Sequence, residues 1–211
     1  MLSILLPALR EPACDKALSV CLDCIVDNTS VDYELLLVSR AGSQGVYGAY
    51  MDMARRAQGE HILILNTDMF LAPGWAEPML AASRPDTIVA GVLVECGATG
   101  VSFQNIKLDF GQLPETFRRK EFENWASSPE RSLPAGYGHH APVVFDRKEF
   151  LAFGGYNLKL GEYPHATLDQ ELWARWKASG RKRVRVKSYC YHLQAWSQPQ
   201  ERSRATRRGK K

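Results

Sequence analysis

The stretch His61-Ile-Leu-Ile-Leu-Asn-Thr-Asp68 decides the fold class of this chain. Its first five residues are mostly apolar and form a run that is long enough for a strand and too short for a helix. The run leads directly into a polar turn that ends in the acid Asp68. A buried strand that opens into a polar turn is typical of α/β sheets, in which ligands bind beyond the carboxyl ends of the strands.

Outward from this strand, short apolar runs alternate with helical patterns. We expect further strands at Ser3–Leu6, Tyr33–Val38 and Thr87–Val94, and helices at Asp15–Asn28, Val46–Ala57 and Pro73–Ser83. This alternation predicts one α/β domain with a mainly parallel central sheet flanked by helices. The composition agrees, because 45% hydrophobic and 24% charged residues exclude a disordered or collagen-like chain.

The second half of the sequence is less regular. Gly97–Gly138 indicates long loops with short strands, a pattern that often covers a site. After it we expect a strand at Ala141–Phe145, helices at Arg147–Phe153 and Leu168–Ser179, and a strand at Arg183–Tyr191.

Positive charge is concentrated at the end of the sequence. The 211 residues include 27 Lys and Arg against 23 Asp and Glu, a net charge of +4. The last eleven residues hold six basic residues and one acid, or +5, so the rest of the chain sums to −1. We expect a near-neutral domain and a basic, disordered tail at 196–211 that touches anionic surfaces at most weakly. No specific nucleic-acid partner is indicated.

The sequence indicates neither a membrane span nor a disulfide framework. The apolar run Leu2–Leu6 is closed by Pro7 and is too short for a signal peptide or a membrane-spanning helix. The five cysteines are an odd number without regular spacing, and Cys21 and Cys24 lie inside an expected amphipathic helix. We therefore expect a cytoplasmic protein with buried, reduced thiols.

Three acids and one histidine stand where chemistry is possible. Asp68 follows a buried strand, where a carboxylate can hold Mg²⁺ against a diphosphate or can bond its own backbone in a turn. Asp169 and Glu171 lie near the start of a helix, where acids suit the helix dipole and where a general base would face a cleft. His192 ends the last expected strand, either as a packed core ring or as a ligand. Spacing alone leaves both interpretations open at each position.

Seven segments resemble motifs of the inverting glycosyltransferase family two, whose members have the GT-A fold. They are Ser3-Ile-Leu-Leu-Pro7, Asp32-Tyr-Glu-Leu-Leu-Leu-Val38, Ala57-Gln-Gly-Glu-His-Ile-Leu-Ile-Leu-Asn-Thr-Asp68, Ala72-Pro-Gly-Trp75, Gly154-Gly-Tyr-Asn157, Leu168-Asp-Gln-Glu-Leu172 and Tyr189-Cys-Tyr-His-Leu193. Each segment alone is a weak signal. Together they follow the family's order and spacing over residues 2–195, which makes the resemblance specific.

The resemblance implies a GT-A domain over 1–195, with a nucleotide-sugar-binding half at 1–94 and an acceptor-binding and catalytic half at 95–195. It implies a metal-dependent, hexosyltransferase-like inverting enzyme, in which Asp68 and His192 bind Mn²⁺ or Mg²⁺ and Asp169 is the catalytic base. The acceptor would be a glycan, a lipid-linked molecule or a protein. The nucleotide-diphosphate sugar, a UDP-sugar by first expectation, would contact Pro7, Leu9, Glu11, Ser39, Arg40, Asn66 and Thr67.

Three positions depart from the family pattern. Ser39 and Arg40 stand where the family has acids, one of which contacts the nucleobase. The metal motif has a single acid, Asp68, where the stricter pattern has two, and Leu168 replaces a glutamate. The resemblance therefore leaves the nucleotide and the sugar open.

Two other functions fit the same segments. A GT-A domain that has lost catalysis would bind a glycan or a partner, and the single-acid metal motif favours this alternative. A nucleotidyltransferase also places acids at strand ends, but Leu6-Pro-Ala-Leu-Arg-Glu11 lacks the glycines that its phosphate loop would need. No Gly-x-x-x-x-Gly-Lys, Gly-x-Ser-x-Gly or His-Glu-x-x-His motif occurs, which excludes P-loop nucleotidases and the common serine hydrolases and zinc proteases.

Overall fold

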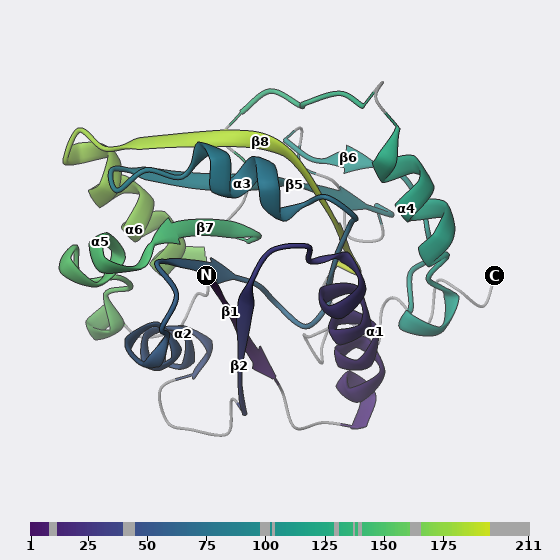
Figure 1. Ribbon diagram of the computed structural model, residues 1–211, viewed down its shortest axis with the longest axis horizontal. Coiled ribbons are helices and arrows are strands. Elements are labelled where there is room, and N and C mark those ends of the chain that lie inside the picture. The colour runs from purple at the N-terminus through teal and green to yellow at the C-terminus, as the bar shows by residue number, and fades with distance from the viewer. Residues whose placement is uncertain are drawn as a thin grey trace.

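The computed structural model of the protein describes residues 1–8, 12–39, 45–97, 102, 104–128, 131–136, 138, 141–160 and 166–194. Strands and helices alternate in the first half of the chain and are less regular in the second half (Figure 1). In chain order the elements are β1 (Leu2–Ala8), α1 (Pro12–Asn28), β2 (Tyr33–Ser39), α2 (Gly45–Arg56), β3 (His61–Ile64), β4 (Met69–Leu71), α3 (Ala76–Ala82), β5 (Thr87–Glu95), β6 (Ile106–Lys107), the 3-10 helix η1 (Pro114–Thr116), α4 (Arg119–Ser127), β7 (Val143–Asp146), α5 (Arg147–Ala152), the 3-10 helix η2 (Leu158–Leu160), α6 (Ala166–Ala178) and β8 (Lys182–His192).

One mixed sheet forms the centre of the domain, in the strand order β2-β1-β3-β7-β5-β8-β4, with β6 beside β5. Among the described strands, four neighbouring pairs are parallel (β1–β2, β1–β3, β5–β6 and β5–β8) and three are antiparallel. The predicted α/β domain with a mainly parallel sheet is therefore confirmed. The sequence does not predict that β7 runs antiparallel between β3 and β5. Because β7 opposes both neighbours, β3 and β5 point the same way and end at the same edge.

Helices pack on both sides of this sheet. In Figure 1, α1 and α2 lie on opposite sides of β1 and β2. α1 buries Ala17, Cys21, Cys24 and Ile25, whose spacing places them on one face of the helix. All five cysteines are buried and none of them forms a disulfide with another described cysteine, as the sequence predicts. Within the described part of the chain, no helix has both the length and the apolar character needed to cross a membrane.

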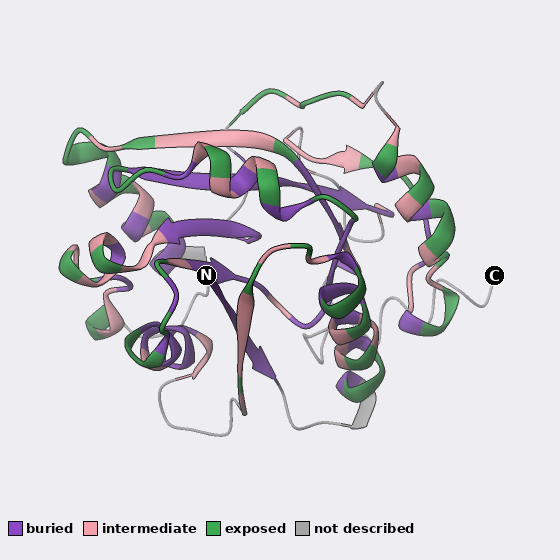
Figure 2. Ribbon diagram, viewed as in Figure 1, coloured by how far each residue is buried: buried purple, intermediate pink, exposed green. Residues whose placement is uncertain are grey.

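Burial differs among the strands, and this positions the candidate site. β1 and β5 are buried along their whole length, as Figure 2 shows. β8 is partly exposed at its start and buried only at residues 188–191. Its last residue, His192, therefore lies where the strand leaves the core.

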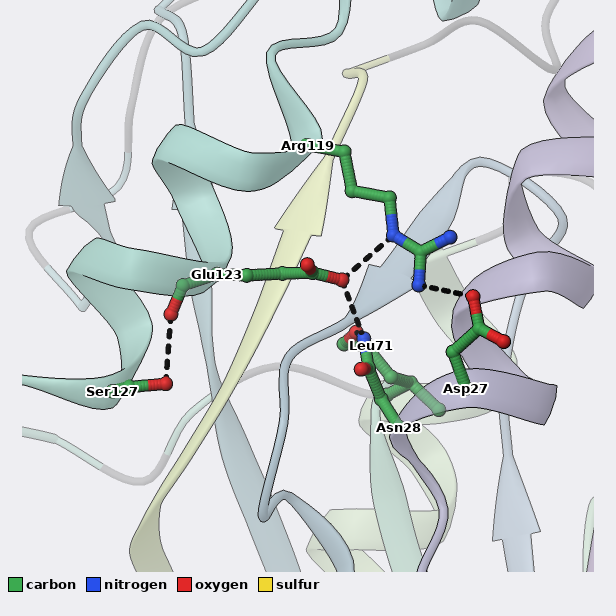
Figure 3. A network of polar contacts seen from close by, with 6 residues as sticks. All are labelled: Asp27, Asn28, Leu71, Arg119, Glu123 and Ser127. Atoms are coloured by element: carbon green, nitrogen blue, oxygen red, sulfur yellow. Dashed lines mark hydrogen bonds and ion pairs between the residues drawn. The ribbon is translucent and has the colours of Figure 1, made fainter.

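A polar network joins α4 to α1 and β4 (Figure 3). Arg119 donates from Nε to Glu123 Oε1 at 2.6 Å and from Nη2 to Asp27 Oδ2 at 2.8 Å. The side-chain amide of Asn28 donates to Glu123 Oε1 at 2.9 Å and to the carbonyl oxygen of Leu71 at 2.8 Å. These bonds fix the short helix α4 against the C-terminal end of α1.

Most predicted elements are present within a few residues of their expected bounds. The helix expected from Pro73 begins at Ala76. β4 and α4 are not predicted by the sequence. α4 lies in the segment 97–138, for which the sequence indicates only loops and short strands, and it buries only Phe122 and Ala126.

Candidate active site

The carboxyl ends of β1, β2 and β3 meet at one edge of the sheet. Pro7 lies near the end of β1 and Ser39 ends β2, and the parallel register of the two strands puts both at this edge. Asn66, Thr67 and Asp68 follow β3, which pairs with the other side of β1. The structure thus brings these five predicted site residues to one edge. The predicted nucleotide-binding residues outside the described ranges are Leu9, Glu11 and Arg40.

The Asp68 carboxylate is almost completely buried, with 2% of the residue exposed. Its Oδ1 atom is buried and accepts no hydrogen bond from the described residues. Its Oδ2 atom lies 3.8 Å from Nε2 of His192. A buried carboxylate oxygen without a hydrogen bond costs free energy. This arrangement therefore suits a bound cation, which would replace the missing partner.

Strand pairing brings His192 to Asp68. His192 pairs with Met69 across the antiparallel strands β8 and β4. The backbone nitrogen of Leu193 donates to the carbonyl oxygen of Asp68 at 3.0 Å. Because Asp68 directly precedes Met69, the predicted ligand pair from distant parts of the chain comes together here.

A second carboxylate holds the other side of the imidazole. Nδ1 of His192 lies 2.8 Å from Oε1 of Glu95, which ends β5 and is 5% exposed. Burial lowers the pKa of His192, but the hydrogen bond to Glu95 and the negative charges of Asp68 and Glu95 outweigh it. The pKa of His192 therefore lies above its usual value. His192 is held between two acids.

Three tyrosines connect this edge of the sheet to Asp169. Tyr50 donates from its hydroxyl to Asn66 Oδ1 at 2.6 Å. The ring of Tyr156 lies 6.2 Å from that of Tyr50 and 4.7 Å from that of Tyr47, between centroids. Tyr47 donates to Asp169 Oδ2 at 2.6 Å. Burial and the negative charge of Asp169 raise the pKa of Tyr156. The three tyrosines therefore link Asp169 to Asn66 through packed rings and hydrogen bonds.

The two acids of α6 have different surroundings. Asp169 is 3% exposed and accepts a hydrogen bond from the hydroxyl of Tyr47. Glu171 forms an ion pair with Arg175, with 2.8 Å between Oε1 and Nε. Arg175 in turn donates to the carbonyl oxygen of Gly155 at 2.6 Å. Glu171 thus helps to fix the glycine turn, and Asp169 is the candidate for a general base.

A pocket of about 430 Å³ lies near these tyrosines but outside the predicted site. It is lined by α2, the segment 154–159 and α6, including Tyr156 and Glu171. Asp68, Asp169 and His192 do not line it. Tyr156 lines the pocket, is 4% exposed and lies near Asp169, whose charge adds to burial in raising the pKa of the tyrosine.

The donor set at Asp68 fits a divalent metal that is held jointly with a substrate. Within the described residues, no group of three His, Cys, Asp or Glu side chains is placed to hold a metal ion. Asp68 and His192 offer one oxygen and one nitrogen 3.8 Å apart. Two ligands of one such ion stand about 3–4 Å apart, because each lies about 2 Å from it. Mg²⁺ commonly takes one or two carboxylates and completes its shell from phosphate oxygens and water.

Comparison with known proteins agrees with this architecture. The sequence model described as Glycosyl transferase family 2 matches residues 32–134, from β2 to the segment before β7. The match includes Asp68 but neither Asp169 nor His192. No curated protein matches the chain.

Solved structures of similar fold are GT-A glycosyltransferases. A crystal structure of GalNAc-T7 with UDP, GalNAc and Mn²⁺ matches with a TM-score of 0.62 and 12% identity, over 91% of this chain and 43% of that chain. A crystal structure of S. aureus TarS matches with a TM-score of 0.61 and 13% identity, over 90% of this chain and 36% of that chain. The chain thus spans less than half the length of either protein. At these identities the likeness shows the fold, and with the family match it supports a glycosyltransferase.

The sequence analysis does not single out Glu95, Tyr47, Tyr50 or Tyr156. Glu95 carries the same signal as Asp68, since it is an acid that closes a run of apolar strand residues. Tyr47 and Tyr50 stand three residues apart in a helix that follows a strand end, and residues so spaced share a helix face. For Tyr156 the signal is its place directly after the glycine pair.

Proposed function

We propose that this protein is a metal-dependent inverting glycosyltransferase, which moves a sugar from a nucleotide-diphosphate donor to an acceptor hydroxyl. The observation that carries the proposal is the buried Asp68 carboxylate beside His192 at the carboxyl edge of the sheet, with one oxygen that accepts no hydrogen bond from the described residues. The family match over this segment and the fold support the same function.

Asp68 and His192 would hold Mn²⁺ or Mg²⁺ together with the donor's diphosphate. A metal at this place supplies Lewis-acid stabilisation of the negative charge on the departing nucleoside diphosphate. The donor would lie along the strand ends that carry Pro7, Ser39 and Asn66-Thr67. A UDP-sugar remains the first expectation, and GalNAc-T7 was crystallised with UDP.

Asp169 would act as the general base. Its carboxylate would take the proton from the acceptor hydroxyl while that oxygen forms a bond to the anomeric carbon. The bond from the anomeric carbon to the diphosphate oxygen breaks at the same time, and the electron pair leaves with the nucleoside diphosphate. Attack from the face opposite the leaving group inverts the anomeric configuration. A positioned base of this kind contributes roughly 10²–10⁴-fold to the rate.

A thermal-shift panel with UDP, GDP, CMP and TDP, each with and without Mn²⁺, tests the proposal. We expect one nucleotide to raise the melting temperature only when Mn²⁺ is present, because a ligand at 100 times its Kd adds about 2.7 kcal/mol of stability. Asp68→Asn should abolish this shift. Asp169→Asn should keep the shift and lose transfer, measured as release of nucleoside diphosphate from the donor. If no nucleotide changes the melting temperature, the better interpretation is a binding module that has lost catalysis.

A further inference from the structure

Glu95, His192 and Met69 form a row across three neighbouring strands. Glu95 pairs with His192 between β5 and β8, and His192 pairs with Met69 between β8 and β4. Side chains of directly paired residues stand next to each other on one face of a sheet. The row therefore starts at Glu95 and ends beside Asp68, the residue before Met69.

Both oxygens of the Glu95 carboxylate are engaged inside the protein. Oε1 lies 2.8 Å from Nδ1 of His192, and Oε2 accepts a hydrogen bond from the side-chain amide of Asn105 at 2.7 Å. Only 5% of Glu95 is exposed. A buried carboxylate is costly unless it is hydrogen-bonded, and this one is bonded at both oxygens. Glu95 is thus fixed in one orientation, and the imidazole bonded to it is fixed as well.

This contact decides which nitrogen of His192 faces Asp68. Because Nδ1 is bonded to Glu95, Nε2 is the nitrogen directed at Asp68, 3.8 Å from Oδ2. We propose that Glu95 is a positioning residue, which orients His192 so that Nε2 serves as a metal ligand. The inference rests on the proposed function, since it requires a metal at Asp68 and His192. Metal-binding histidines generally donate their other ring N–H to a carboxylate or carbonyl, which fixes the ring and raises its basicity.

Binding of Mn²⁺, measured without turnover, tests the inference. The probe is Mn²⁺ titrated into the full chain, alone and with UDP, with free Mn²⁺ read from its electron paramagnetic resonance signal. Glu95→Ala should raise the Kd for Mn²⁺ by about 10–100-fold, the usual effect of losing such a partner. The matched control is Glu121→Ala, which removes the same charge at a side chain that is 64% exposed and paired with Arg118. The control should bind Mn²⁺ as the wild type does.

A double-mutant cycle separates positioning from a general structural role. If Glu95 acts through the imidazole, Glu95→Ala should have no further effect on the Kd when it is added to His192→Ala. If the two effects multiply, Glu95 acts through another route and the inference is overturned. An unchanged Kd in Glu95→Ala alone overturns it as well.

The outcomes distinguish this inference from the proposed function. If Asp68→Asn and His192→Ala weaken Mn²⁺ binding and Glu95→Ala does not, only the role of Glu95 is wrong. If the wild type binds no Mn²⁺ with any nucleotide of the panel, the metal-dependent function falls and the inference falls with it. Should Glu95→Ala fail to fold, Glu95→Gln keeps the shape without the charge and should raise the Kd several-fold; an unchanged Kd there would overturn the inference.

Discussion

Replacing Tyr47 by phenylalanine removes one hydroxyl from the candidate base and leaves the packing intact. The hydroxyl donates to Asp169 Oδ2 at 2.6 Å, and Tyr47 is 4% exposed, so water does not readily take its place. The aromatic ring, which lies 4.7 Å from that of Tyr156, is retained. The substitution therefore tests the hydrogen bond alone.

The expected loss follows from the energy of a hydrogen bond to a charged group, about 1.5–3 kcal/mol. We take the lower end of this range, because the hydroxyl of Tyr156, whose pKa is raised by burial and by the charge of Asp169, lies near the same carboxylate. A loss of about 1.4 kcal/mol in the transition state is a tenfold decrease in kcat. KM for the donor should stay within about twofold, because the base acts on the acceptor and not on the diphosphate.

The assay is the initial rate of nucleoside diphosphate release at saturating donor. The control is Tyr189→Phe, which also removes a tyrosine hydroxyl but loses a neutral hydrogen bond, to the carbonyl oxygen of Ser132 at 3.0 Å. Equal losses of kcat in both variants would mean that the effect is on general stability. A kcat in Tyr47→Phe within twofold of the wild type would refute the idea that this hydroxyl orients the base.

Three further predictions concern stability. Asn28→Ala should lower the free energy of unfolding in urea by about 1–3 kcal/mol, because it removes one buried and one partly buried hydrogen bond; a change below about 0.5 kcal/mol would contradict this. Gly59→Ala should lower the melting temperature by several degrees, since its Cβ would lie 2.5 Å from Ser3 Oγ and 2.8 Å from Ser3 N. An unchanged melting temperature would show that β1, which carries Ser3, shifts freely to make room. Burial raises the pKa of Cys24 from 9.0 to about 12. The contribution of the protonated thiol to the free energy of unfolding is therefore complete below pH 9 and is lost as the pH rises toward 12. Between pH 8 and 11 the free energy of unfolding should therefore fall less in Cys24→Ala than in the wild type. Parallel plots of this free energy against pH for the two proteins would argue against the prediction.

Local patterns predict the first half of the fold because each element there has its own hydrophobic period. The runs 33–38 and 87–94 are mostly apolar and become β2 and β5, which extend them by one residue each. β4 has only three residues and takes its strand conformation from pairing with β8, which no local pattern records. α4 buries two side chains and is fixed by the contact of Arg119 with Asp27, which lies 92 residues away in sequence, so it too escapes prediction.

The residues of the candidate site also divide into those that the sequence predicts and those that it does not. Asp68, Asp169 and His192 stand at element ends, where the chain itself marks them, and the structure puts Asp68 and His192 in contact. The groups that hold them, Glu95 at the end of β5 and Tyr47 in the first turn of α2, carry only weak local signals. Their roles arise from strand register and helix packing between segments about 100 residues apart or more. The local sequence marks such residues as candidates but does not say which partners they contact.

The insertion of β7 between β3 and β5 has a consequence for how the chain is made. β3 ends at Ile64 and β5 ends at Glu95, but the strand that joins them begins at Val143. Until the ribosome has delivered Val143–Asp146, the nascent chain carries two apolar strands with open edges, and such edges recruit other chains. A fragment that stops after β5 would keep both edges permanently. The nascent chain therefore stays prone to edge-to-edge association until β7 enters the middle of the sheet and β8 (Lys182–His192), which is made still later, covers the other side of β5.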